Sequence, residues 1–211
     1  MTPLSDDQYH LLRADAELIE ADGHGEKVLR LADGTFLKLF RRKRLVSSAL
    51  FYPYAKRFSD NTETLQKLGI ACPTVIGLYR MATIHRDLVH YRPLQGRTLR
   101  QIDVPTEHSE LRARFGAFVA DLHNKGIYFR SLHLGNVILR DDGALGLIDI
   151  ADLAAGGSAL SKRRRLRNFR HIFRYPADRE WIMGDGNIDF FISYALQSKP
   201  AIALNKLLKI I

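Results

Sequence analysis

The sequence contains very little cysteine, since Cys72 is the only one among 211 residues. A single thiol excludes an internal disulfide, and with it the small disulfide-stapled scaffolds of secreted proteins. The sequence also lacks an uninterrupted apolar run of the length that a transmembrane helix needs. Residues 1–20 are acidic and broken by charges, which is not the pattern of a signal or transit peptide. We therefore expect a cytoplasmic protein.

Hydrophobic residues make up 46% of the chain, which excludes a disordered protein and allows a substantial core. The formal net charge is +9, so an anionic partner is expected. The positive charge is concentrated in residues 41–44 and 162–174. The second segment mixes arginine with aromatic residues and favours a binding surface, for which the candidates are Arg163, Arg164, Arg165 and Arg167.

The hydrophobic pattern divides the chain into a strand-rich half and a helical half. Alternating residues predict strands at 16–22, 26–32 and 35–40, joined by Gly23-His24-Gly25 and by an Asp-Gly turn. The rest reads as a helix at 45–68, strands at 74–81 and 82–92, a helix at 107–125, a hairpin at 137–150 and further helices. This layout is α+β, with an N-lobe at 1–92 and a C-lobe at 93–211.

The most informative segment runs from Tyr128 to Asn136 and reads YFRSLHLGN, followed by LIDI at 147–150. Protein-kinase-like folds hold the metal on a nucleoside triphosphate with an asparagine that ends the catalytic loop and with a separate aspartate. Asn136 and Asp149, the latter expected inside a strand, have that order and spacing. Carboxylate and amide oxygens suit Mg²⁺ when phosphate oxygens complete the shell. The segment predicts a protein-kinase-like bilobal fold that binds ATP and Mg²⁺.

The residue expected to act as the catalytic base is absent. Kinases place an aspartate five residues before the metal-binding asparagine, and this chain has Ser131 there. A serine cannot take a proton near neutral pH, although it can hydrogen-bond an acceptor hydroxyl. His133 and Asp152 are candidate substitutes, and a structural role is preferred for His133. Because general-base catalysis contributes about 10²–10⁴-fold, Ser131→Asp is expected to raise phosphotransfer.

Upstream residues complete the expected nucleotide site. Lys38 lies in the strand FLKL, where a phosphate-binding lysine is expected, although an edge strand that turns it to water is the alternative. Gly23 and Gly25 form the candidate phosphate loop, for which a plain hairpin turn is the alternative. The helix partner of Lys38 is open among Asp60, Asn61 and Glu63, and the register of the helix favours Asn61 or Asp60.

The chain resembles the bacterial lipopolysaccharide kinases, which are the heptose and Kdo kinases of the inner core, and most closely their "toluene tolerance" type. The resemblance is carried by FLKLF, LGIACPTVIGLYR, HYRPLQGRTLR, LHNKGIYFRSLHLGNVIL and GLIDIADL. It implies ATP-dependent phosphorylation of a core sugar hydroxyl at the inner face of the cytoplasmic membrane. It also implies that Lys38 contacts the α- and β-phosphates, and that Tyr91 lies in the hinge against adenine.

Three classes of function remain open at this point. The first is a kinase of a lipopolysaccharide inner-core sugar, whose partner is the anionic core or another phosphorylated saccharide. The second is a pseudokinase or regulatory scaffold of envelope biogenesis, because Ser131 replaces the catalytic aspartate. The third is a basic anion-binding module, which leaves Lys38, Asn136 and Asp149 unexplained. No nucleic-acid-binding motif is present, so nucleic acid is not the expected partner.

Overall fold

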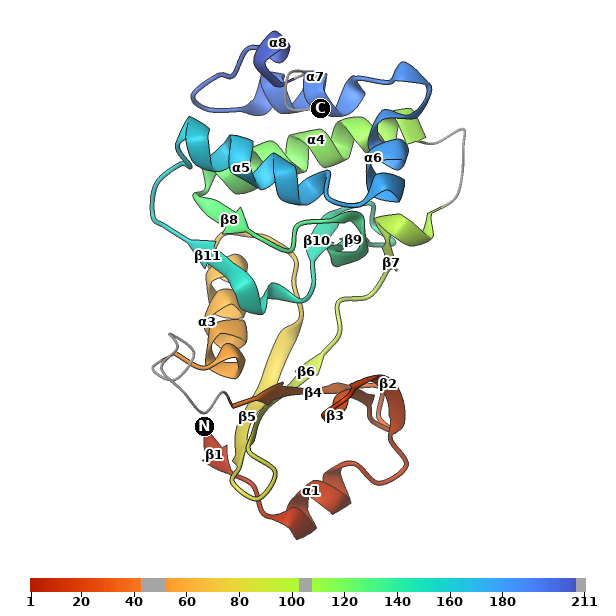
Figure 1. Cartoon of the computed structure of the whole chain (residues 1–211), viewed down its shortest axis with the longest axis vertical. Coiled ribbons are helices and arrows are strands. Elements are labelled where there is room, and N and C mark those ends of the chain that lie inside the picture. Colours follow the sequence, from red (N-terminus) through yellow and green to blue (C-terminus); the bar gives the residue numbers. More distant parts are fainter. Residues whose placement is uncertain (43–51, 103–107, 208–211) are drawn as a thin grey trace. The chain divides into compact units, whose positions relative to one another are not determined.

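The structure is a computed structural model that describes residues 1–42, 52–102 and 108–207. They belong to two compact units, Met1–Leu94 and Gln95–Ile211 (Figure 1). The first is built around a sheet and the second is mostly helical, which confirms the expected α+β class. No helix in the described ranges is long and apolar enough to cross a membrane.

Among its described residues, the first unit contains a six-stranded sheet and two helices. The strand order is β1-β5-β6-β4-β3-β2, and all neighbours are antiparallel except β1 and β5. The elements are β1 (Thr2–Pro3), α1 (Asp6–Leu12), β2 (Glu17–Asp22), β3 (Gly25–Arg30), β4 (Phe36–Arg41), α3 (Tyr54–Lys67), β5 (Thr74–Met81) and β6 (Arg86–Arg92).

The strand β4 separates two apolar layers in this unit. Leu37 and Leu39 are buried in one cluster with Tyr9 of α1. The alternate residue Phe40 points to the other face, because successive side chains of a strand alternate. There its ring centroid lies 6.5 Å from that of Phe58 in α3. The helix α3 therefore covers the face of the sheet that also carries Lys38.

The second unit contains the catalytic-loop segment. Its strands form two small sheets, β10-β9-β7 and β11-β8. Its elements are β7 (Arg97–Thr98), η1 (Leu99–Gln101), α4 (His108–Asn124), β8 (Ile127–Phe129), η3 (Leu134–Asn136), β9 (Val137–Leu139), β10 (Leu145–Leu147), η4 (Ile150–Asp152), β11 (Leu153–Ala155), α5 (Lys162–Ile172), α6 (Pro176–Met183), η5 (Gly184–Gly186), α7 (Asp189–Gln197) and α8 (Leu204–Leu207), where η marks a 3-10 helix.

Aromatic side chains fill the core between α4, α5 and α7. The ring of Phe169 in α5 lies 4.8 Å from that of Tyr194 in α7, and both are fully buried. Gly116 lets α4 approach α7 closely, because a Cβ atom at this position would lie 2.0 Å from the carbonyl oxygen of Phe190. This core provides a rigid support for the β8–β11 pair.

Several elements differ from those expected from the sequence. Residues 45–51 of the expected helix lie outside the described residues, and α3 begins at Tyr54. The strand expected at 82–92 begins at Arg86, because residues 82–85 form a turn. The elements α1, β1 and β11 were not expected. The strand β10 ends at Leu147, so Asp149 is not inside a strand.

Candidate active site

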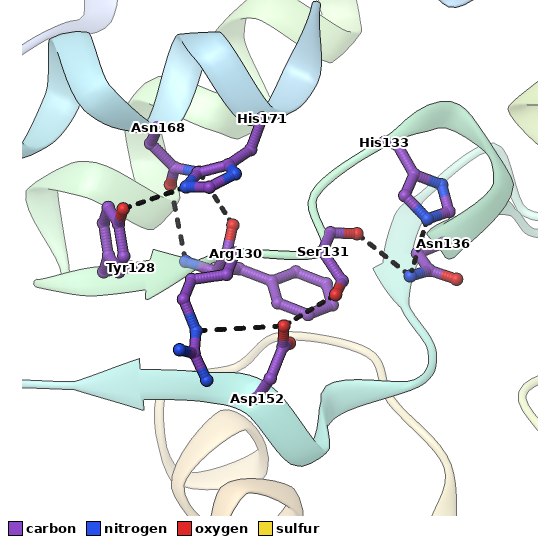
Figure 2. Close-up of polar contacts among 9 residues, drawn as sticks. Tyr128, Arg130, Ser131, His133, Asn136, Asp152, Asn168 and His171 are labelled. Carbon is purple, nitrogen blue, oxygen red and sulfur yellow. Dashed lines mark hydrogen bonds and ion pairs between the residues drawn. The ribbon is translucent and has the colours of Figure 1, made fainter. Parts of the chain in front are cut away.

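The loop that follows β8 is held in place by α5. Asn168 is fully buried, and its Nδ2 donates to the carbonyl oxygen of Phe129 at 2.7 Å. Its Oδ1 accepts from the backbone N–H of Phe129 at 3.4 Å. A side-chain amide thus satisfies both backbone groups of the last residue of β8, where the ladder ends. The loop containing Ser131 begins from this fixed point (Figure 2).

Asn136 has a fixed amide orientation. Its Nδ2 donates to the carbonyl oxygen of Ser131 at 2.9 Å and lies 3.3 Å from Nε2 of His133. The carbonyl oxygen of its side chain points away from both partners in Figure 2, and no hydrogen bond to it occurs within the described part of the chain. Asn136 is 8% exposed. The oxygen that a hard cation prefers is therefore presented, and the nitrogen is engaged.

Asp149 lies beside Asn136 through the backbone. The N–H of Ile148 donates to the carbonyl oxygen of Asn136 at 3.0 Å. Asp149 then adopts φ 52° and ψ 45°, which is the left-handed region that aspartate tolerates better than most residues. This turn corrects the expectation of a strand through LIDI and leaves Asp149 exposed. Left-handed non-glycine residues are enriched at functional sites.

These two residues suit a magnesium ion that phosphate oxygens help to coordinate. The described residues contain no group of three or more His, Cys, Asp or Glu side chains that could hold a metal ion. Two oxygen ligands alone are too few for Mg²⁺, which takes six. The pair suits a metal ion whose remaining ligands come from a bound nucleotide.

Ser131 contacts a carboxylate. Its Oγ donates to Oδ2 of Asp152 at 2.6 Å (Figure 2). Asp152 also lies 4.0 Å from Nε of Arg130. Burial raises the pKa of Asp152 above its usual value, and the hydrogen bond from Ser131 opposes that shift. The structure therefore brings together the serine that replaces the expected base and the carboxylate considered as a substitute.

His133 has a different environment. Its ring packs edge-on against Tyr175 at 5.3 Å between centroids, and Nδ1 is buried without a hydrogen bond among the described residues. Burial and the guanidinium of Arg100 lower the pKa of His133. Its Nε2 faces the amide of Asn136. This geometry suits a residue that orients Asn136, in line with the structural role preferred from the sequence.

Two further residues, which hold this loop from other elements, could not be recognised from the sequence. Asp178 in α6 is 1% exposed and accepts from the backbone N–H of Leu134 at 3.0 Å. Arg100 binds the same carboxylate through Nε at 2.9 Å and through its terminal nitrogen at 2.8 Å. The ion pair fixes the start of η3. Its members are 78 positions apart, and no local pattern links them.

Lys38 lies in the first unit on a central strand. β4 pairs with both β3 and β6, so the alternative of an edge strand is wrong. The residue is half-buried on the α3 face, and its Nζ lies 5.7 Å from the ring centroid of Phe40. On α3, Asn61 is buried, Asp60 binds Lys56 and Tyr52, and Glu63 is exposed. Of the three candidates on α3, the buried Asn61 is therefore favoured as the residue that faces the interior of the first unit.

The other expected nucleotide residues also lie in the first unit. Gly23 lies in the turn between β2 and β3, and Gly25 is the first residue of β3, with φ 107°, a conformation that side chains disfavour. Tyr91 in β6 packs its ring 5.3 Å from that of Phe58 and 5.8 Å from that of Phe36. Their roles toward a nucleotide remain predictions.

The basic segment forms the helix α5 and continues to Arg174. Arg163, Arg164 and Arg167 are exposed, as expected for a binding surface. Arg165 is a correction, because its side chain is fully buried. It donates to the carbonyl oxygens of Leu160 and Lys199, to Oδ1 of Asn124 and to the hydroxyl of Tyr194. A guanidinium with these contacts cannot also bind a ligand at the surface.

Comparison with known proteins identifies the fold. No family model matches the sequence, and no curated protein is significantly similar. An aminoglycoside-3'-phosphotransferase of type VIII is similar in structure over 97% of this chain and 96% of its own, at 15% identity and a TM-score of 0.70. A divergent Toxoplasma kinase that lacks the glycine-rich loop matches over 99% of this chain and 85% of its own, at 15% identity and a TM-score of 0.47. The Rio2 kinase of Chaetomium thermophilum matches over 95% of this chain and 72% of its own, at 14% identity and a TM-score of 0.47.

The first of these likenesses shows that the chain has a protein-kinase-like fold, which confirms that part of the resemblance drawn from the sequence. The lipopolysaccharide kinase family is not established by these comparisons and remains a prediction.

Proposed function

We propose that the chain is an ATP-dependent kinase that transfers a phosphoryl group to a hydroxyl of a lipopolysaccharide inner-core sugar. The observation that carries the proposal is the pair of Asn136 and Asp149, with the amide oxygen of Asn136 presented and the backbone next to Asp149 joined to Asn136 by the bond from Ile148. A fold shared with a protein named as an aminoglycoside-3'-phosphotransferase is consistent with this chemistry.

Each of the predicted site residues has a proposed role in this reaction. Asn136 and Asp149 would hold Mg²⁺, which neutralises charge on the phosphates when it is bound with ATP. Lys38, which lies in β4, would bind phosphate oxygens of the nucleotide. The backbone near Gly23 and Gly25 would cover the phosphates, and Tyr91 would lie toward the adenine. Phosphoryl transfer depends mainly on positioning and charge neutralisation, so these roles account for most of the expected catalysis.

A pseudokinase or regulatory scaffold of envelope biogenesis is the second candidate, and one observation favours it. Position 131 carries a hydroxyl where a kinase carries its base. A pseudokinase of this kind would bind ATP and leave it intact, whereas a kinase would consume it. Turnover by the wild-type protein therefore separates the two.

Nucleotide binding is expected to raise the melting temperature in a magnesium-dependent manner. A ligand that binds only the folded state stabilises it by about 2.7 kcal/mol at one hundred times its Kd. We expect Asp149→Asn to abolish the magnesium-dependent part of the shift and Lys38→Ala to reduce it. Differential scanning fluorimetry with ATP and Mg²⁺, compared with ATP and chelator, measures both effects.

Matched substitutions provide the controls for this experiment. Asp141→Asn changes an exposed aspartate in the turn between β9 and β10, and Lys67→Ala changes an exposed lysine at the end of α3. Both should retain the full shift. If millimolar ATP with Mg²⁺ leaves the melting temperature of the wild-type protein unchanged, the nucleotide-binding function is rejected.

We further propose that α5 receives the anionic part of the acceptor. Arg163, Arg167 and Arg170 of α5 recur at helical spacing, Arg174 follows just after the helix, and all four are exposed. They form one stripe of guanidinium groups, which we call the α5 arginine stripe. Arginine binds phosphate and carboxylate groups through paired hydrogen bonds. Such an acceptor would be met at the inner face of the cytoplasmic membrane, with the cytoplasmic protein in peripheral contact.

Neutralising the stripe is expected to weaken acceptor binding and spare nucleotide binding. We expect Arg163, Arg167 and Arg170 changed together to serine to lower the affinity for phosphorylated core oligosaccharide at least tenfold and to flatten its salt dependence, because fewer screened charges contribute. Isothermal titration at two salt concentrations measures this, and the ATP-induced thermal shift should be unchanged.

The matched control removes the same charge elsewhere. Arg30, Arg97 and Arg140 lie outside α5, and their joint replacement by serine also removes three positive charges. Equal losses of affinity in the two triple variants would assign the binding to net charge and reject the stripe. Binding of anionic lipid vesicles, with no binding of the oligosaccharide, would instead assign α5 to the membrane surface.

A further inference from the structure

The loop after β8 and the turn before β11 bring two side chains together at one end of a strand pair. Phe129 pairs with Leu153 in the antiparallel β8–β11 ladder. Ser131 lies two residues beyond the first, and Asp152 lies one residue before the second. Their side chains meet just past the end of the ladder, at 2.6 Å between Oγ and Oδ2. The contact therefore depends on strand register and not on a flexible loop alone.

Asp152 retains an acceptor that none of the described residues uses. Its side chain is 22% exposed, and Oδ1 is buried with no hydrogen-bond partner among the described residues. Buried polar side-chain atoms nearly always have a hydrogen-bond partner, and a catalytic role is one of the explanations for an exception. The charged or titratable groups that act on Asp152 are Arg130 and Asp149, and both His133 and His171 lie close enough to respond to it.

Ser131 alone cannot act as a base, whereas the pair can. The hydroxyl of Ser131 is directed at the carboxylate, so the lone pairs of Oγ are available to accept a proton from a second hydroxyl. His133 is less well placed, because its Nε2 faces the amide of Asn136 and its Nδ1 is buried. In Figure 2 the ring of His133 is directed at the amide of Asn136, whereas Asp152 is directed at Ser131.

We propose that Ser131 and Asp152 form the proton-accepting pair of this kinase, with Ser131 relaying the proton and Asp152 holding it. The proposal rests on the phosphotransfer function proposed above. The acceptor hydroxyl gives its proton to Oγ of Ser131, and the proton of Ser131 passes to Oδ2 of Asp152. The acceptor oxygen forms its bond to the γ-phosphorus of ATP as the bond from that phosphorus to the β–γ bridging oxygen breaks. The electron pair of the broken bond leaves with ADP.

Kinetics of single and double variants test the relay. With dephosphorylated core oligosaccharide as the probe acceptor and radiolabelled ATP as donor, we expect Asp152→Asn and Ser131→Ala each to lower kcat by about 10²–10³-fold. The double variant should be no slower than the slower single variant, because the two groups act as a unit. All three should keep the ATP- and magnesium-dependent thermal shift, and Asp141→Asn should keep wild-type turnover.

A titration that does not depend on turnover tests the contact itself. Carbon-13 NMR of the Asp152 carboxyl gives its pKa in the protein without nucleotide. Ser131→Ala should raise this pKa further, because a hydrogen bond that stabilises the carboxylate is lost. A variant that only loosens the fold would not produce this directed change.

The failures of the two proposals are distinguishable. Wild-type turnover in Asp152→Asn, or an Asp152 pKa that is unchanged in Ser131→Ala, overturns the relay and leaves the kinase function standing. A wild-type protein that binds ATP and transfers no phosphoryl group overturns the relay and favours the pseudokinase. A wild-type protein that shows no stabilisation by ATP overturns the proposed function, and the relay with it.

Discussion

Replacing Arg165 with methionine is expected to lower the melting temperature of the second unit by roughly 6–20 °C. The side chain is fully buried, and its guanidinium joins the loop before α5, the end of α4, the hydroxyl of Tyr194 and the segment at Lys199. Each buried acceptor left without its hydrogen bond costs about 1–3 kcal/mol, so the loss of this network is expected to cost about 3–5 kcal/mol in total. For a chain of 211 residues, each kcal/mol corresponds to about 2–4 °C.

The melting temperature of the second unit can be measured separately. Trp181 in α6 is the only tryptophan of the chain, so its fluorescence reports on unfolding of the second unit. Arg163→Met is the matched control on the same helix, because Arg163 is exposed, and its effect should stay within about 0.5 kcal/mol. A similar small effect for Arg165→Met would contradict the structural role assigned to this residue.

A second large effect is expected at low pH, where the folded protein loses stability because of His123. The residue is fully buried, with Nδ1 2.8 Å from the hydroxyl of Tyr194 and Nε2 3.2 Å from Oδ1 of Asn168. Burial lowers the pKa of His123 to about 3, and the neighbouring Arg165 acts in the same direction. Since Oδ1 of Asn168 can only accept, Nε2 carries the proton and Nδ1 accepts from Tyr194.

The sign of the pH dependence follows from this lowered pKa. Between the unfolded value of about 6.5 and the folded value of about 3, the unfolded chain binds a proton at His123 and the folded protein does not. Stability is therefore fully present above about pH 6.5 and is lost as the pH falls toward 3. One pKa unit corresponds to about 1.4 kcal/mol, so the loss at pH 5 is roughly 2 kcal/mol.

Comparison with His123→Gln isolates this contribution. The buried or half-buried His90, His133 and His171 also have lowered pKa values and add to the acid sensitivity of both proteins equally. We expect the free energy of unfolding of the wild-type protein to fall by about 2 kcal/mol more than that of the variant between pH 7 and pH 5. Urea unfolding at the two pH values measures both free energies, and an equal fall in the wild-type protein and the variant would refute the assignment.

The parts of the site that the sequence predicted lie within short stretches of chain. Asn136 and Asp149 are linked by one tight hairpin, so their proximity follows from local structure. The helix α1 was missed although its signal was present, because Ser5 and Gln8 form a capping box. The strand β11 has three residues, which is too short for an alternating pattern to be recognised.

The role of Arg165 was missed because its basic neighbours suggest a solvated surface. Its helical register contained the necessary signal, since Arg165, Asn168, Phe169 and Ile172 recur on one face and all are buried. The pair of Arg100 and Asp178 could not be found in the same way. Contacts between distant segments depend on how α6 packs, and a single sequence carries no pattern for that.

The contact between Ser131 and Asp152 also constrains how the site could change by mutation over time. An aspartate at position 131, expected from the sequence alone to raise phosphotransfer, would lie beside an existing carboxylate, and two such groups cannot both ionise readily. Losing Asp152 first would remove the proton acceptor. Either order of substitution therefore passes through a poorer intermediate, which is sign epistasis. A lineage with this pair would remain at serine even if aspartate were chemically the better base.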